Sequence, residues 1–174
     1  MATEIVRRPA PLSGAVLLAQ TDALMRLWYA DEDADAETLR PLVVAARAAI
    51  EDGSAKAVCI AVTQVARPNE IGQIVAELIG SFIPPKDTNL KVFSRMMAED
   101  ISAAAPSLQA LQLAAVKLRR SCDFIPSIAK VLAAVAEQDG KLKARADLIR
   151  TLPAKIVAIE RLLGPAAAPK AAAQ

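Results

Sequence analysis

The sequence predicts an all-α protein in which a compact multi-helix unit is followed by an extended, heptad-patterned C-terminal helix. Hydrophobic residues make up 54% of the 174 residues and aromatic residues only 3%. The core must therefore consist of Leu, Ile, Val and Ala, a mixture that favours close-packed helices over a β-sandwich. Apolar residues also recur at helical spacing in separate stripes, and no convincing pair of strands accompanies them.

Residues 1–53 predict an acidic pair of helices. The first is expected to begin at an N-cap, Ser13, and to continue to Trp28. The acidic stretch 31–37 interrupts the apolar pattern and places negative charge ahead of the second helix, where the helix dipole favours it. The second helix is expected to end at Gly53, a C-cap residue. Its apolar stripe consists of Leu39, Leu42, Val43, Ala46 and Ile50.

Residues 54–136 predict the compact helical unit, which begins with an ambiguous segment. The alternating Val and Ile residues of 54–67 have strand chemistry, but Val58, Val62 and Val65 also share one helical face. Periodicity does not decide between strand and helix for so short an apolar run. We expect a helix, because no second strand exists to pair with this one.

Two further helices follow in the same unit. One is expected to be capped by Asn69 and to end at the prolines of 83–89, which forbid its continuation. The next is expected to be capped by Asp87 or Thr88 and to stop before Pro106. The apolar positions of these two helices are Ile71, Ile74, Val75, Leu78, Ile79, Phe82, Leu90, Phe93, Met97 and Ile101.

Two Pro-Ser pairs, at 106–107 and 126–127, introduce helices by the same local pattern. Proline pushes the residue before it toward extended geometry, and the serine hydroxyl accepts hydrogen bonds from amides of the new first turn. Phe124 and Ile125 are therefore expected in a short extended connection between two helices, tucked toward the core.

The C-terminal region, residues 137–164, continues a heptad pattern that begins upstream of it. Apolar residues recur every seven positions from Ile128 to Leu163. Such a pattern is typical of a helix that packs along another helix. The last residues, 165–174, form an Ala/Pro-rich tail that is expected to be flexible.

An unbroken helix across these heptads would be roughly 54 Å long, more than a compact domain of ~100 residues covers. Gly140 and Pro153 are expected to bend or break it. The distal half would then fold back as a hairpin, or it would leave the core and pack on another chain. Self-association or contact with a foreign partner is expected in the second case. The seam would consist of Ile149, Leu152, Ile156, Ile159 and Leu163.

The sequence contains no catalytic, cofactor-binding or metal-binding motif, and we expect a protein that is not an enzyme. Histidine, the commonest general base and metal ligand, is absent. Two isolated cysteines, Cys59 and Cys122, form neither a zinc site nor a disulfide framework and indicate a reducing cytoplasm. No run approaches the ~20 apolar residues that a membrane span needs.

The net charge of +2 is unevenly distributed along the chain. Up to Gly53, five Lys or Arg residues stand against nine Asp or Glu, and from Ser54 onward sixteen stand against ten. A polyanion is therefore expected to meet the second half of the chain. Six cations there are candidate contacts with DNA or a protein partner, and equally they suit solvated helix ends. They are Lys117, Arg119, Arg120, Lys141, Lys143 and Arg145.

Residues 74–136 resemble a known family. An apolar helix ending in "SFIPP" is followed by a helix that runs to a proline, a helix with the basic end "KLRRS", and the block "FIPSIAKVL". This order is similar to that of the replicative helicase loader/inhibitor family of bacteriophages and prophages. Lys130 departs from the family's pattern, which often has an acidic residue there. The residues that match the motif are Phe124, Pro126, Ser127 and Ile128.

The resemblance implies a small all-helical DNA-replication accessory without ATPase activity that engages the replicative helicase, as a loader or an inhibitor. The sequence also supports an alternative of another class, an oligomeric structural or regulatory adaptor that binds DNA directly. In that alternative the heptads supply the contacts between copies, and the basic second half supplies the contacts with phosphate. The first hypothesis requires a protein partner, and the second requires nucleic acid.

Overall fold

The computed structural model describes residues 22, 24–30, 34–84, 86 and 89–164. The helices predicted after residue 36 are present, whereas most of the first predicted helix lies outside the described residues. The fold is all-α. The β-type pairing among these residues is limited to one isolated antiparallel bridge, between Val65 and Ser107. The helices are α2 (Ala36–Glu51), α3 (Ser54–Thr63), α4 (Pro68–Gly80), α5 (Leu90–Ala104), α6 (Leu108–Ser121) and α7 (Ile128–Leu163).

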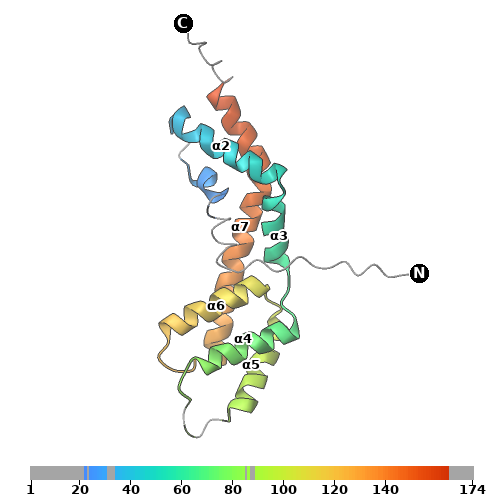
Figure 1. Cartoon of the computed structure of the whole chain (residues 1–174), viewed down its shortest axis with the longest axis vertical. Helices are drawn as coiled ribbons and strands as arrows, with labels where there is room; N and C mark the ends of the chain where they lie inside the picture. Colours follow the sequence, from blue (N-terminus) through green and yellow to red (C-terminus); the bar gives the residue numbers. More distant parts are fainter. Residues whose placement is uncertain (1–21, 23, 31–33, 85, 87–88, 165–174) are drawn as a thin grey trace, which may run out of the picture.

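The helix α7 runs along the long axis of an elongated molecule, and the other helices gather around its two halves (Figure 1). α2 and α3 lie beside its C-terminal half, whereas α5 and α6 contact its N-terminal half and α4 packs on α5 and α6. Two clusters of buried apolar residues result, and each includes part of α7. We call the corresponding units the first lobe (described residues of 24–62, with 142–163) and the second lobe (described residues of 66–135).

The first lobe packs a short helical segment, residues 24–29, together with α2 and α3 against α7. Trp28 donates a hydrogen bond from Nε1 to the backbone oxygen of Leu148, 2.9 Å away. The ammonium of Lys155 lies 5.5 Å from the centroid of the indole ring, within cation–π range. The α7 residues buried in this lobe recur at helical spacing and are Leu142, Ala146, Ile149, Leu152, Ile156 and Ile159.

The second lobe confirms the apolar stripes predicted for α4 and α5. On α4 the stripe is buried from Ile71 to Ile79, and Phe82 packs against the same cluster just beyond the helix. On α5 Met97 and Ile101 are fully buried. α6 and the first turns of α7 close this cluster with residues that recur every three or four positions, as expected for helices with one buried face.

Four helix starts confirm or correct the predicted caps. The side chains of Ser107 and Ser127 accept the backbone N–H groups of Ala110 and Lys130, each at 3.3 Å, as predicted. The predicted cap at Asn69 is wrong, because α4 begins at Pro68 and its N-cap is Arg67, two residues before the predicted one. α5 is capped by Asn89, not by the predicted residues 87–88, which lie outside the described residues.

The start of α4 has a specific local cause. Pro68 occupies the first turn, where its missing N–H costs nothing, and the carboxylate of Glu70 accepts the N–H of Arg67 at 2.7 Å. These two residues fix the helix start before Asn69. The acidic stretch ahead of α2 behaves as predicted, since Asp35 Oδ1 accepts the N–H of Thr38 at 2.7 Å. The cap predicted at Ser13 lies outside the described residues.

The segment 54–67 is helical over its first ten residues, which confirms the helix prediction there. After Thr63 the chain becomes extended and crosses from the first lobe to the second. α3 packs in the first lobe, so the lobes divide near residues 63–66 and not at the predicted boundary after Gly53. The predicted units 54–136 and 137–164 are likewise not separate, because α7 belongs to both lobes. The tail 165–174 lies outside the described residues.

α7 is one helix of 36 residues, so the predicted break at Gly140 or Pro153 is wrong. Proline removes one backbone donor and its ring crowds the preceding turn, at a cost of ~3 kcal/mol. Here Pro153 faces solvent. Ile149, Leu152 and Ile156, on either side of it along the helix, are buried in the first-lobe cluster with residues of α2 and α3. Burial of several such side chains offsets the cost of the proline.

The stripe predicted as an intermolecular seam is covered within the chain. Four of its five residues are buried in the first lobe, and Leu163 packs against the same cluster. The prediction ended the compact unit at residue 136 and treated residues 1–53 as a separate helical pair, so it did not place that pair against the distal half. α2 and α3 supply that cover, so self-association is not needed to bury the seam.

Candidate functional site

The connection between α6 and α7 is held at both ends by the local pattern that the sequence predicts. α6 ends at Ser121, and the N–H of the extended residue Cys122 donates to the carbonyl of Leu118 at 3.0 Å. At the other end Pro126 is buried and Ser127 caps α7. Residues 122–127 therefore form a short, defined connection on the second lobe.

The side chain of Phe124, within this connection, points away from the core, contrary to the prediction that it tucks toward it. Its side chain is 75% exposed, whereas its neighbour Ile125 packs against the second-lobe cluster. The chain bends at Asp123 and Phe124, and of the two adjacent apolar side chains only that of Ile125 reaches the core. Phe124 is the most exposed of the described aromatic residues apart from Tyr29. An exposed Phe in an aromatic-poor chain is a candidate contact for another protein.

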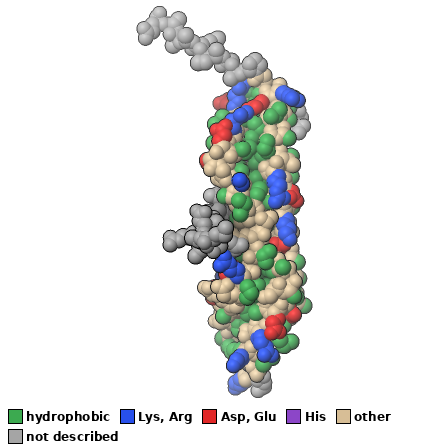
Figure 2. Space-filling view, turned by 90° about the vertical axis from the view of Figure 1, so that its right-hand side faces the viewer, with side chains coloured by type: hydrophobic (Ala, Val, Ile, Leu, Met, Phe, Trp, Pro, Cys, Tyr) green, Lys and Arg blue, Asp and Glu red, His purple; other side chains and the backbone are tan. Residues whose placement is uncertain are grey.

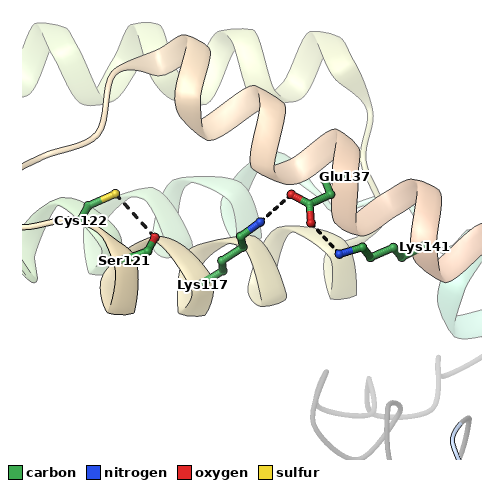
Figure 3. Close-up of polar contacts among 5 residues, drawn as sticks. All are labelled: Lys117, Ser121, Cys122, Glu137 and Lys141. Atoms are coloured by element: carbon green, nitrogen blue, oxygen red, sulfur yellow. Dashed lines mark hydrogen bonds and ion pairs between the residues drawn. The ribbon is translucent and has the colours of Figure 1, made fainter.

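Three of the six predicted cations form ion pairs with two carboxylates of α7, Glu137 and Asp139. Lys117 Nζ lies 2.5 Å from Glu137 Oε2, and Lys141 Nζ lies 2.6 Å from Glu137 Oε1, so one carboxylate joins α6 to α7 (Figure 3). Lys143 Nζ lies 2.5 Å from Asp139 Oδ2. Glu137–Lys141 and Asp139–Lys143 are spaced i, i+4, the helical spacing that predicts such pairs from sequence.

The remaining three cations divide differently. Arg145 Nη1 lies 2.9 Å from Asp22 Oδ1, close enough for an ion pair but not aligned for a hydrogen bond. Arg119 and Arg120, in the last turn of α6, are exposed and make no ion pair within the described part of the chain. On the face shown in Figure 2, Lys and Arg side chains are spread along the molecule and mixed with acidic ones. The structure does not gather the six cations into one basic ridge.

The carboxylates of this region are strongly biased toward their ionised forms. Hydrogen bonds from Lys117 and then Lys141 hold the pKa of Glu137 at about 2. Partial burial raises the pKa of Asp139, but hydrogen bonds from Lys143 and Ser107 outweigh burial and leave its pKa below the usual value. Both groups are therefore negative at neutral pH and neutralise cations that the sequence offered as contacts.

Replacing Glu137 by Gln is expected to lower stability at pH 7 by a small amount. Because the folded pKa lies below that of the unfolded carboxyl, the two lysine pairs stabilise the fold above pH ~4.5 and lose this effect as pH falls toward ~2. Urea midpoints of wild type and Glu137→Gln should therefore differ at pH 7 and converge near pH 2. Glu99→Gln, which removes a single exposed pair with Arg95, is the control and should shift the midpoint less. A difference in urea midpoint between wild type and Glu137→Gln that stays the same at all pH values would contradict the lowered pKa of Glu137.

A hollow of about 350 Å³ lies between α2 and the end of α7. Its charged lining residues are already engaged, because Arg40 donates to the carbonyl of Leu163 at 3.3 Å and Glu160 pairs with Arg47 at 2.6 Å. The rest of its lining includes Val43. The hollow therefore does not present a set of free polar side chains that could bind or transform a ligand.

Across the described segments, no three His, Cys, Asp or Glu side chains come together as a metal site would require. Cys59 and Cys122 are free thiols in different lobes, and burial raises the pKa of Cys59. None of the helices that the structure describes is both long and apolar enough to cross a membrane. The chain matches no protein-family model, and no curated protein or solved structure matches it significantly.

Proposed function

We propose that this protein is a non-catalytic accessory that acts by binding another protein through the α6–α7 connection, and that the partner is a replicative helicase. The observation that supports a protein contact is the exposed Phe124 on a connection whose two ends are fixed. The resemblance of residues 74–136 to helicase loader/inhibitor proteins supports the identity of the partner. A phage or prophage replication role follows from the same resemblance.

The surroundings of Phe124 favour a protein contact. Arg119 and Arg120 lie five and four positions before Phe124 and remain without acidic partners among the described residues. Exposed aromatic and Arg side chains are the types enriched where binding energy concentrates in interfaces. A fixed connection also presents them without a large ordering cost on binding.

Direct DNA binding, the alternative, is less well supported. Four of the six candidate cations have acidic neighbours, which compete with phosphate for them. Only Phe124 is an exposed aromatic close to these cations in sequence, so the stacking surfaces typical of single-strand binding are sparse. The heptad stripe that was to join copies of the adaptor is covered within the chain.

The test is capture of the replicative helicase by tagged protein from a bacterial lysate, followed by affinity measurement with the purified helicase. Wild type is expected to capture it, and Phe124→Ala should raise Kd by ~30-fold, as loss of ~2 kcal/mol at a hot spot implies. Leu162→Ala removes an equally exposed apolar side chain at the opposite end of the molecule and should leave Kd unchanged.

The outcomes separate the parts of the proposal. If wild type fails to bind the helicase, the partner is wrong. If Phe124→Ala binds as well as wild type, the contact surface is wrong. Binding to labelled DNA, measured over a salt series, tests the alternative. Phosphate-driven binding must weaken steeply between about 50 and 200 mM salt. Strong, salt-sensitive DNA binding without helicase capture would favour the DNA-binding adaptor.

A further inference from the structure

The two lobes meet on α7 at a stretch that contributes nothing to either core. The last α7 residue in the second-lobe cluster is Val135, and the first in the first-lobe cluster is Leu142. None of the six residues between them, 136–141, is buried. Elsewhere in α7 a buried residue follows within every turn until the last one. Buried apolar side chains therefore support the helix at both ends of this stretch, whereas within it the contacts with α6 are polar, from Lys117 to Glu137 and from Ser107 to Asp139.

This stretch contains Gly140, a residue that weakens a helix. Glycine in a helix interior makes local opening about fivefold easier than alanine does, because its backbone loses more freedom on folding. Packing does not require glycine here, since a Cβ added at Gly140 would meet no atom within 4 Å. The same is true of Gly72 on α4, which lies inside the second lobe. Gly140 is thus placed where α7 lacks support, with no steric reason for its small size.

Ser107 fastens both places where the chain crosses between the lobes. The residues on either side of Ser107 bond to the segment 64–66, where the chain first crosses between the lobes. The N–H of Ala66 donates to the carbonyl of Pro106 at 2.9 Å, and the N–H of Leu108 donates to the carbonyl of Gln64 at 3.1 Å. Its own N–H and Oγ donate to Asp139 Oδ1, on the α7 crossing, at 3.1 and 2.9 Å. One buried serine at the start of α6 therefore holds the two crossings together.

Direct contact between the lobes is otherwise limited. From residues 66–135, only Ala110 and Leu113 of α6 join the apolar cluster of the first lobe, as far as the described residues show. Beside them, Gln109 is fully buried, and neither its Oε1 nor its Nε2 has a hydrogen-bond partner in the described part of the chain. A buried amide without partners disfavours the closed arrangement, because water would satisfy it when the lobes separate.

We propose that α7 is a hinge at Gly140 and that the Ser107–Asp139 contact is the latch that holds the two lobes in the arrangement of Figure 1. When the latch opens, α7 bends within residues 136–141 and the second lobe turns relative to the first. Each lobe keeps most of its core during this motion, because neither core includes a residue of the hinge, and only Ala110 and Leu113 of α6 would leave the first-lobe cluster. The proposal does not depend on the identity of any partner.

Spin-label distance measurements between the lobes test the hinge. Labels at Lys56→Cys on α3 and Lys91→Cys on α5, both exposed sites, report on the two lobes in a Cys59→Ala, Cys122→Ala background. Asp139→Ala breaks the latch but keeps Ser107 as the cap of α6. It is expected to broaden the distance distribution or to add a second distance. Adding Gly140→Ala should narrow the distribution again, whereas adding Gly72→Ala should not.

Two controls make the result decisive. Lys143→Ala removes the exposed ion pair of Asp139 without touching the latch, so it should leave the distances as in wild type.

Hydrogen exchange at amides 141–145 should slow about fivefold in Gly140→Ala and stay unchanged in Gly72→Ala. Distances in Asp139→Ala that equal those of wild type would overturn the latch and the hinge together. Broadening that Gly140→Ala and Gly72→Ala reverse equally would overturn Gly140 as the hinge.

Discussion

Truncation after Gln138 is expected to unfold α2 and α3, although both remain in the shortened chain. The deletion removes every α7 residue of the first-lobe cluster, and these residues form the surface on which both helices lie. What is left is a helix of 16 residues and one of 10, and isolated helices of this length are marginal in water. The buried side chains of α2 and α3, such as Leu39 and Val58, would become exposed.

Circular dichroism and limited proteolysis measure this effect. The loss of helical signal should exceed that of the deleted residues by the whole of α2 and α3, and cleavage should concentrate in 36–63 and spare α4 and α6. Truncation after Gly164 is the control, because it keeps all of α7 and should retain both helices. A soluble, monodisperse product with α2 and α3 protected would contradict the expectation. It would instead favour the view that the distal half of α7 serves another chain.

The elements that sequence reasoning predicts well are those with a local cause. The stripe on α4 and the serine caps of α6 and α7 depend on residues within one or two turns of each other, and they are found where predicted. Cap choice fails where neighbouring residues compete. At α4 the N-cap is Arg67 and not Asn69, because the proline after Arg67 and the carboxylate of Glu70 fix the helix start first.

The features that sequence reasoning misses depend on distant parts of the chain. Ser107 is recognisable as a cap, but its contact with Asp139 joins residues 32 positions apart. The cover of α7 by α2 and α3 is equally non-local, since a heptad stripe does not specify whether its partner belongs to the same chain. At the candidate site, the prediction that Phe124 tucks toward the core is wrong, because the sequence does not say which of two adjacent apolar residues reaches the core.

Replacing Leu152 by Ala is expected to lower the free energy of unfolding of the first lobe by ~3 kcal/mol. Leu152 is fully buried at the centre of the α7 face that meets α2 and α3. Leu→Ala at such a site loses the transfer free energy of the side chain and leaves a cavity. The matched control is Leu162→Ala, ten residues later on the same helix, where the side chain is 70% exposed and the change should stay within ~0.5 kcal/mol.

Fluorescence of Trp28, the only tryptophan, reports unfolding of this lobe, because its ring packs against the first-lobe cluster and its Nε1 is bonded to α7. Urea midpoints for Leu152→Ala and Leu162→Ala should be measured over a range of protein concentrations. If Leu152 packs within its own chain, the urea midpoint of Leu152→Ala is lower than that of wild type, and neither midpoint depends on protein concentration. If it packs against a second copy, the wild-type midpoint rises with concentration, because association stabilises the folded state by mass action. A concentration-dependent midpoint, or equal shifts in the two variants, would contradict the intramolecular core, since only burial distinguishes these two leucines.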